Sequence, residues 1–136
     1  MIQLMENVRR VTIKRLSEPT SLRERLLSIT EGHLKAVDFD LHSFMRKMEA
    51  TLSDEQMKAM RKSEQAILDA LENEFRKSIA SGEIGPVDPR VIARAYTSLL
   101  MMGHATDGNG DKMFPHVREA ATQIIDILWH GLYPPK

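Results

Sequence analysis

The chain contains no cysteine. This absence excludes disulfides, thiolate zinc sites and cysteine nucleophiles within it. An excess of charge of either sign is also missing, because 19 basic side chains balance 19 acidic ones among 136 residues. We therefore expect no broad positive surface for nucleic acid or for an anionic membrane. No apolar run approaches the ~20 residues that span a bilayer, and the N-terminus does not resemble a signal peptide, so we expect a cytoplasmic protein.

Local signatures of catalysis and of metal binding are also missing. There is no Gly-x-Ser-x-Gly elbow, Walker loop or dinucleotide-binding glycine pattern, and none of the five histidines has metal-site spacing on a helix. The segment 107–111 resembles the first half of a calcium loop, but Lys112 and Arg118 stand where glycine and glutamate are required. We expect no metal, no cofactor and no catalytic centre, although histidines distant in sequence can still meet in space.

What the sequence does contain is helical periodicity. Apolar residues recur at three- and four-residue steps between a few Pro/Gly punctuation points, and no stretch alternates as a strand does. The chain is long enough for one domain and leaves little room for two. We predict an all-α, six-helix bundle in a single domain, with helices over about 2–16, 22–37, 41–48, 54–81, 89–105 and 115–132.

Several helix ends carry specific capping signals. Ser21 with Glu24, and Ser53 with Gln56, have the spacing of capping boxes, and Asp40 can cap the short third helix. Gly82 lies where a left-handed C-cap glycine is expected. Asp88 followed by Pro89 is the clearest helix start in the sequence, with aspartate as the N-cap and proline at the first helical position.

The last two helices are apolar around more than half of their circumference. A helix that packs on one core needs an apolar arc of only about 100°, so a second face is left to be covered. Because twofold dimers are the commonest oligomers, we expect a homodimer; a monomer that buries both helices centrally is the alternative. The residues expected at the dimer interface are Val91, Ala95, Ser98, Met102, Ala120, Ile124, Ile127 and Gly131.

Polar residues on otherwise apolar faces mark a candidate pocket. Glu64 interrupts the apolar stripe of the longest helix, and His33 lies on the inward face of the second helix. Glu64 either reaches water or lines a pocket, and His33 is either a satisfied core histidine or a ligand contact. Nine methionines against seven aromatic residues also suit an adaptable apolar cavity. The residues expected to bind a ligand are His33, Phe44, Met45, Met48, Met57, Met60, Glu64 and Tyr96.

The C-terminal half resembles a known family. The run 67–71 to 79–84, the Gly-Glu-Ile followed by Asp88-Pro89, and a terminal apolar helix ending in Gly131-Leu132 are similar to the effector-binding and dimerisation region of TetR-family transcriptional repressors. The order and approximate lengths of all six helices also agree, so the resemblance covers nearly the whole chain.

The resemblance implies a particular division of the chain. Residues 1–17 would be a connecting helix, residues 21–85 would surround a pocket for a small, largely apolar effector, and residues 88–132 would form the dimer. Effector binding would shift the first helix and change the spacing of the DNA-binding heads. The family's N-terminal helix-turn-helix is missing here, so DNA would be bound only through a domain outside this chain. A fragment, a mis-assigned start and a stand-alone dimeric binding protein all remain open, and a small helical enzyme is the third hypothesis.

Overall fold

The computed structural model describes residues 2–36 and 41–132. Within these ranges the chain forms six α-helices and no strand, as the apolar periodicity predicts. A single isolated bridge joins Thr106 to Lys112 in the loop before the last helix. None of the helices in the described ranges has both the length and the hydropathy needed to cross a membrane. The helices are α1 (Ile2–Leu16), α2 (Leu22–Ala36), α3 (Leu41–Glu49), α4 (Asp54–Ala80), α5 (Pro89–Met102) and α6 (Val117–Leu132).

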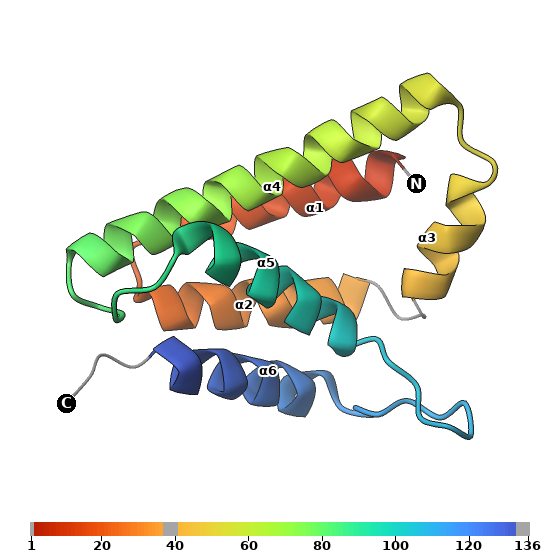
Figure 1. Cartoon of the computed structure of the whole chain (residues 1–136). Coiled ribbons are helices and arrows are strands. Elements are labelled where there is room, and N and C mark those ends of the chain that lie inside the picture. Colours follow the sequence, from red (N-terminus) through yellow and green to blue (C-terminus); the bar gives the residue numbers. More distant parts are fainter. Residues whose placement is uncertain (1, 37–40, 133–136) are drawn as a thin grey trace.

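The helices form a layered bundle. The long helix α4 lies beside α1, α2 packs between α1 and α6, and α5 packs on α4 (Figure 1). The short helix α3 lies at one end of the bundle, where it joins α2 to the start of α4 (Figure 1). The opposite end contains the end of α1, the start of α2 and the end of α4. The two ends of the bundle are therefore formed by different helix ends.

Most of the capping signals are confirmed. Ser53 Oγ accepts from the amide of Gln56 at 3.2 Å, and the amide of Ser53 donates to Gln56 Oε1 at 2.9 Å, which completes the capping box of α4. Asp88 caps α5 with Pro89 in its first turn, and Gly82 adopts a left-handed φ of 80° after α4. These features depend on neighbouring residues alone, so the sequence is sufficient to predict them.

Helix ends that depend on tertiary contacts were predicted less well. Helix α5 ends at Met102, not near Ala105, and α6 begins at Val117, not at Pro115. Gly103 lies so close to α2 that a Cβ atom there would be 2.5 Å from Leu34 Cδ2. The chain then turns away as a loop closed by bonds such as Met113 N to Ala105 O. The proposed cap Asp40, and Val37 at the end of the second helix, lie outside the described residues.

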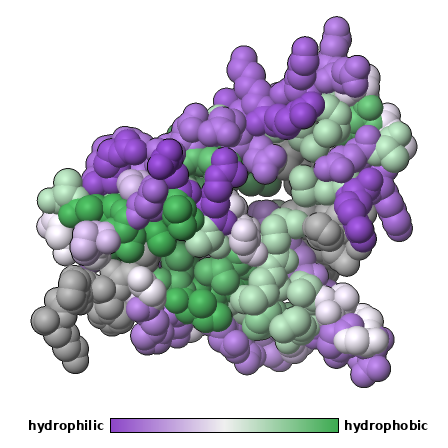
Figure 2. Space-filling view, in the orientation of Figure 1, coloured by the Kyte–Doolittle hydropathy of each residue, from purple (hydrophilic) through white to green (hydrophobic). Residues whose placement is uncertain are grey.

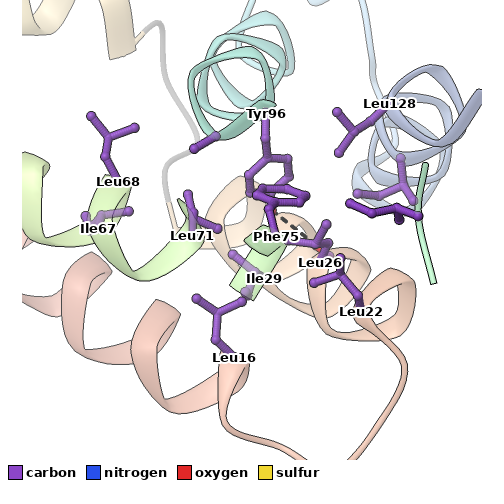
Figure 3. Packing of buried hydrophobic residues seen from close by; sticks show 13 residues of the cluster. Leu16, Leu22, Leu26, Ile29, Ile67, Leu68, Leu71, Phe75, Tyr96 and Leu128 are labelled. Atoms are coloured by element: carbon purple, nitrogen blue, oxygen red, sulfur yellow. Dashed lines mark hydrogen bonds between the residues drawn. The ribbon is translucent and has the colours of Figure 1, made fainter. Parts of the chain in front are cut away.

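The main core is the place where five helices meet. Leu16 of α1, Phe75 of α4 and Leu128 of α6 are all buried there, with Leu22 and Leu26 of α2 at 0 % exposure (Figure 3). Burial of apolar area of this kind stabilises a fold by roughly 25 cal/mol per Å². This core begins at the end of the bundle where α1 ends and α2 begins, and it continues along the bundle to residues such as Ile67 and Leu68, which line the cavity described below.

A smaller core corrects part of the predicted dimer interface. Ala120 and Ile124 of α6 are 1 % and 0 % exposed, because α2 and the end of α5 cover them within the chain. Part of the second apolar face of α6 is thus used internally. These two side chains are not available to a partner, and we remove them from the interface.

Candidate functional site

A cavity of about 410 Å³ lies among α1, α2, α3, α4 and α5. Its size is within the roughly 300–1,000 Å³ of typical small-molecule sites. Eight of its fifteen lining residues are aliphatic or methionine, and the other seven carry a polar group. The residues that line it are Val8, Thr12, Ile29, His33, Met45, Glu64, Ile67, Leu68, Leu71, Arg94, Tyr96, Thr97, Ser98, Leu100 and Met101.

The structure brings together half of the residues expected to bind a ligand. His33, Met45, Glu64 and Tyr96 line the cavity, and they come from four different helices. The other four do not line it: Phe44, Met48 and Met57 are half-buried elsewhere, and Met60 is buried at 4 % exposure. Their apolar spacing correctly marks the inner faces of α3 and α4. Spacing does not show which turn of an inner face borders empty space.

Several lining residues were not predicted. Val8 and Thr12 of α1 lie one turn apart and face the cavity, as do Arg94 and Thr97 of α5. Thr12 is only 5 % exposed. Thr12 does have a signal in the sequence, because it is a polar residue that follows Val8 at the four-residue step of an inward helix face. The α5 residues carried no comparable signal.

His33 is the most unusual side chain of the site. Neither ring nitrogen has a hydrogen-bond partner among the described residues, although both are buried. Its ring centroid lies 5.0 Å from that of His104, which follows α5, with the rings tilted by 57°. Burial, and secondarily the charge of His104, lowers the pKa of His33 to about 4. The imidazole is therefore neutral at physiological pH.

Tyr96 forms part of the wall but its hydroxyl is already used. The side chain is 0 % exposed, and its Oη lies 2.8 Å from Thr30 Oγ1 and donates to Leu26 O at 3.2 Å (Figure 3). Burial raises the pKa of Tyr96. The ring can contact a ligand, whereas the hydroxyl joins α5 to α2. Its polar role is structural.

Glu64 and Arg94 supply the charged groups of the lining. Both residues are exposed and lie on α4 and α5, so their charged ends are hydrated at the rim of the cavity. Glu64 thus reaches solvent and also lines the pocket, whereas recognition of a polar or cationic ligand group by its carboxylate stays a prediction. Charges in such positions interact weakly with a ligand because water screens them.

The C-terminal end of α1 is fixed by two arginines of the bundle. Arg25 of α2 donates from Nη1 to Leu16 O and to Glu74 Oε2, the latter at 2.9 Å. Arg15 of α1 donates to the Ser28 carbonyl and to Ser28 Oγ of α2. Val8 and Thr12, which line the cavity, lie one to two turns before this fixed end. The α1 wall of the cavity is therefore held from one side.

The remaining residues of the expected interface belong to α5 and α6, and Figure 2 shows one face of the molecule over these helices. Val91 and Ile127 are 60 % and 53 % exposed, Gly131 is exposed, and Ala95 and Met102 are half-buried. Apolar side chains gather over α5 and α6 on this face, and the surface is hollowed between α4 and α5 (Figure 2). Ser98 is exposed and also lines the cavity. The cavity therefore adjoins this apolar surface.

The calcium-like segment forms a tight turn. Asp107 Oδ1 accepts from the amides of Asn109 and Asp111 at 2.8 and 3.1 Å, and Gly110 has a left-handed φ of 84°. This aspartate oxygen is occupied by its own backbone, as in an Asx turn. Across the described residues, no group of three or more His, Asp or Glu side chains is placed to hold a metal ion.

Comparisons with protein-family models, with curated proteins and with solved structures give no match to this chain.

Proposed function

We propose that this chain binds a small, largely apolar molecule in the cavity among α1–α5, as the effector-binding and dimerisation domain of a TetR-like transcriptional regulator. The observation that carries the proposal is the cavity itself: its volume is about 410 Å³, eight of its fifteen lining residues are aliphatic or methionine, and one is an unpartnered histidine. A ligand that fills such a space gains roughly 25 cal/mol per Å² of apolar surface removed from water.

Binding without catalysis fits this lining better than an enzyme does. A histidine that acts as a base is oriented by a partner such as a carboxylate. Neither nitrogen of His33 has such a partner among the described residues, and Glu64 is at the exposed rim. We therefore propose no catalytic role for either residue.

A homodimer is the second part of the proposal. Large apolar side chains such as Val91 and Ile127 remain exposed on α5 and α6, next to half-buried Ala95 and Met102. Gly131 and Ser98 are small, and small residues allow two helices to approach closely. A second copy of the same face would cover these side chains in a twofold arrangement. The edge of this dimer interface would run along the cavity, because Ser98 belongs to the expected interface and also lines the cavity.

In this arrangement, ligand binding would change the position of α1. Val8 and Thr12 form the α1 wall, while Arg15 and Arg25 fix the end of the same helix to α2. A ligand pressing on the wall would shift α1 where it lies along α4, while polar contacts hold its C-terminal end to α2. In a TetR-like regulator, that motion would be passed to a DNA-binding domain attached before α1.

Two matched pairs of variants test binding and dimerisation separately. For binding, Thr97→Trp places an indole in the cavity wall. Thr122→Trp is its control, because the hydroxyl of each threonine donates to a carbonyl of its own helix at 2.9 Å. The neutral fluorescent probe N-phenyl-1-naphthylamine should bind the parent chain and the control, and at least ten-fold more weakly the Thr97 variant. Equal binding by both variants would remove the cavity from the proposal.

For dimerisation, light scattering after size exclusion should give twice the chain mass for the parent. Ile127→Glu combined with Val91→Glu should give a monomer, because two carboxylates per copy would be buried unpaired. Ile13→Glu is the control, since Ile13 is a comparably exposed isoleucine of α1 at 43 %. A parent that stays monomeric at micromolar concentration would overturn the dimer.

The alternative function is a dimeric binding protein that acts without DNA. It has the same cavity and the same interface and differs in what is joined to the chain. The coding DNA upstream of Met1 separates the two. An in-frame helix-turn-helix supports the regulator, whereas a ribosome-binding site directly before Met1 with no upstream frame supports the alternative.

A further inference from the structure

A second hollow of about 350 Å³ lies next to the cavity, between α4 and the first part of α5. Figure 2 shows the surface hollowed between these two helices. The lining of the second hollow differs from that of the cavity, because five of its eight residues have a charged or amide side chain. We call it the polar hollow, and these five residues are Gln65, Glu72, Asp88, Arg90 and Arg94.

Two residues, Leu68 of α4 and Arg94 of α5, line both the cavity and the polar hollow. Along α5, the lining of the cavity continues from Arg94 to Met101, whereas the lining of the polar hollow runs from Arg94 back to Asp88. The two spaces therefore follow one another along the helix. A molecule that extends from the cavity into the polar hollow has to lie beside Arg94.

The carboxylates of the polar hollow are already paired, whereas Arg94 is not. Asp88 pairs with Arg90 at 3.3 Å, and Glu72 pairs with Arg76 at 2.9 Å. Among the described residues, the Arg94 side chain forms no ion pair and no hydrogen bond. A guanidinium can hold a carboxylate or a similar oxyanion by two parallel N–H bonds. Arg94 is thus available to an anionic group at the junction of the two spaces.

Glu64 carries the opposite charge, but it lies on the cavity side of the junction. It lines the cavity and does not line the polar hollow. A cationic head group in the polar hollow would lie beside Arg94, which repels it, and would find carboxylates that arginines already neutralise. An anionic head group in the same place would be attracted by Arg94 and would remain hydrated. A ligand that lies across the junction is therefore expected to be an anion.

We propose that the ligand is an amphipathic anion, with an apolar body in the cavity and a carboxylate or similar oxyanion at Arg94, where the cavity meets the polar hollow. The inference rests on the proposed function, because it assumes that the cavity is the ligand site. It goes beyond that function by naming the charge of the ligand, the position of its charged group and the residue that selects it.

Three compounds with an eight-carbon chain test the charge of the head group. Octanoate, octylammonium and 1-octanol would each compete with N-phenyl-1-naphthylamine for the full chain at pH 7.4 and low salt, with fluorescence as the readout. Octanoate should displace the probe at about a three-fold lower concentration than octylammonium, the order expected for an exposed ion pair. High salt should reduce this difference, because it screens exposed charges.

The outcomes separate the inference from the proposed function. If octylammonium binds as tightly as octanoate, or if none of the three compounds displaces the bound probe, the inference is overturned while the cavity remains a ligand site. If N-phenyl-1-naphthylamine itself does not bind, the proposed ligand site fails.

An arginine variant assigns the selectivity to its residue. Arg94→Gln removes the charge and should weaken octanoate about three-fold, while 1-octanol binding stays unchanged. Arg118→Gln is the matched control, because Arg118 is exposed on α6 and lines neither space. Arg94→Lys, which keeps the charge and loses the planar fork, should retain part of the octanoate affinity. Equal octanoate binding by the two glutamine variants would contradict the role of Arg94, and so would an equal loss for all three compounds.

Discussion

The two ends of the bundle have the same kind of helices but are held together differently. At the closed end, where α1 ends and α2 begins, Phe75 and Leu22 are fully buried, and Arg25 joins three helices through Leu16 and Glu74. Toward the other end, α1, α2, α4 and α5 surround a cavity, and among the described side chains of α3 only Met45 lines its wall. The apolar spacing is similar along both ends. The difference is that the closed end has a polar anchor in addition to apolar packing, and periodicity alone does not distinguish the two ends.

The largest expected effect tests the packing of the closed end. Phe75→Ala should lower the free energy of unfolding by about 4 kcal/mol, because it removes a fully buried ring from a close-packed core. Met45→Ala, its counterpart at the cavity, should cost less than about 1 kcal/mol, since that side chain is half-buried beside empty space. Urea unfolding of both variants measures the contrast. Similar losses would show that the two ends are equally packed.

The next effect is a loss of folding stability in acid, which arises from His33 at the cavity end. The pKa of His33 is about 4 in the folded chain, well below the ordinary histidine value of 6.5 that applies in the unfolded chain. The unfolded state therefore binds more protons between these values, and stability falls as the pH drops from about 6.5 to about 4. The loss relative to pH 7 is up to about 3 kcal/mol, because one pKa unit corresponds to about 1.4 kcal/mol.

Replacement of the histidine isolates this contribution from that of the carboxylates. Unfolding of the parent, of His33→Gln and of His116→Gln would be measured at pH 7, 5.5 and 4. The titratable groups described beside His33 or around the same cavity are His104, Glu64 and Arg94. We expect the His33 variant alone to lose less stability on acidification. The same acid sensitivity in all three proteins would show that folding does not lower the pKa of His33.

A smaller effect tests the anchor of the closed end. Glu74→Gln should lower stability by about 2 kcal/mol, because it leaves the Arg25 guanidinium, 12 % exposed, without its carboxylate. Glu72→Gln is the control on the same helix, since its pair with Arg76 lies largely at the surface and should contribute less than about 0.5 kcal/mol. Thermal unfolding of the two variants compares them. Equal changes would mean that the buried anchor contributes no more than a surface pair.

The smallest effect lies at the boundary between the two ends. Tyr96→Phe keeps the ring in the core and removes the hydroxyl that bonds to Thr30 and to Leu26 O. The expected loss is about 1 kcal/mol, the usual net contribution of one buried hydrogen bond. Ligand affinity should not change, because that hydroxyl points to α2 and is already satisfied. A fall in the affinity for N-phenyl-1-naphthylamine would instead place the Tyr96 hydroxyl in the binding site.

The candidate site was predictable only in part, and the pattern of success has a physical basis. His33 and Glu64 were found because a polar residue on an apolar face is unfavourable unless something compensates it. Val8 and Arg94 were missed because nothing in their own helices distinguishes them; they line the cavity only through the way α1 and α5 cross α4. Ala120 and Ile124 were assigned to a partner because the sequence does not show that α2 packs on α6.

The sequence by itself determined the helices, their starts at Asp88 and Ser53, the left-handed turn at Gly82 and the absence of cysteine chemistry. These properties depend on backbone hydrogen bonds and side chains within a few residues of one another. Only the tertiary structure decided where the cavity lies, that His33 is left unpartnered in its wall, and which apolar side chains remain exposed. Those properties depend on distances between helices far apart in the chain, and local periodicity contains no information about such distances.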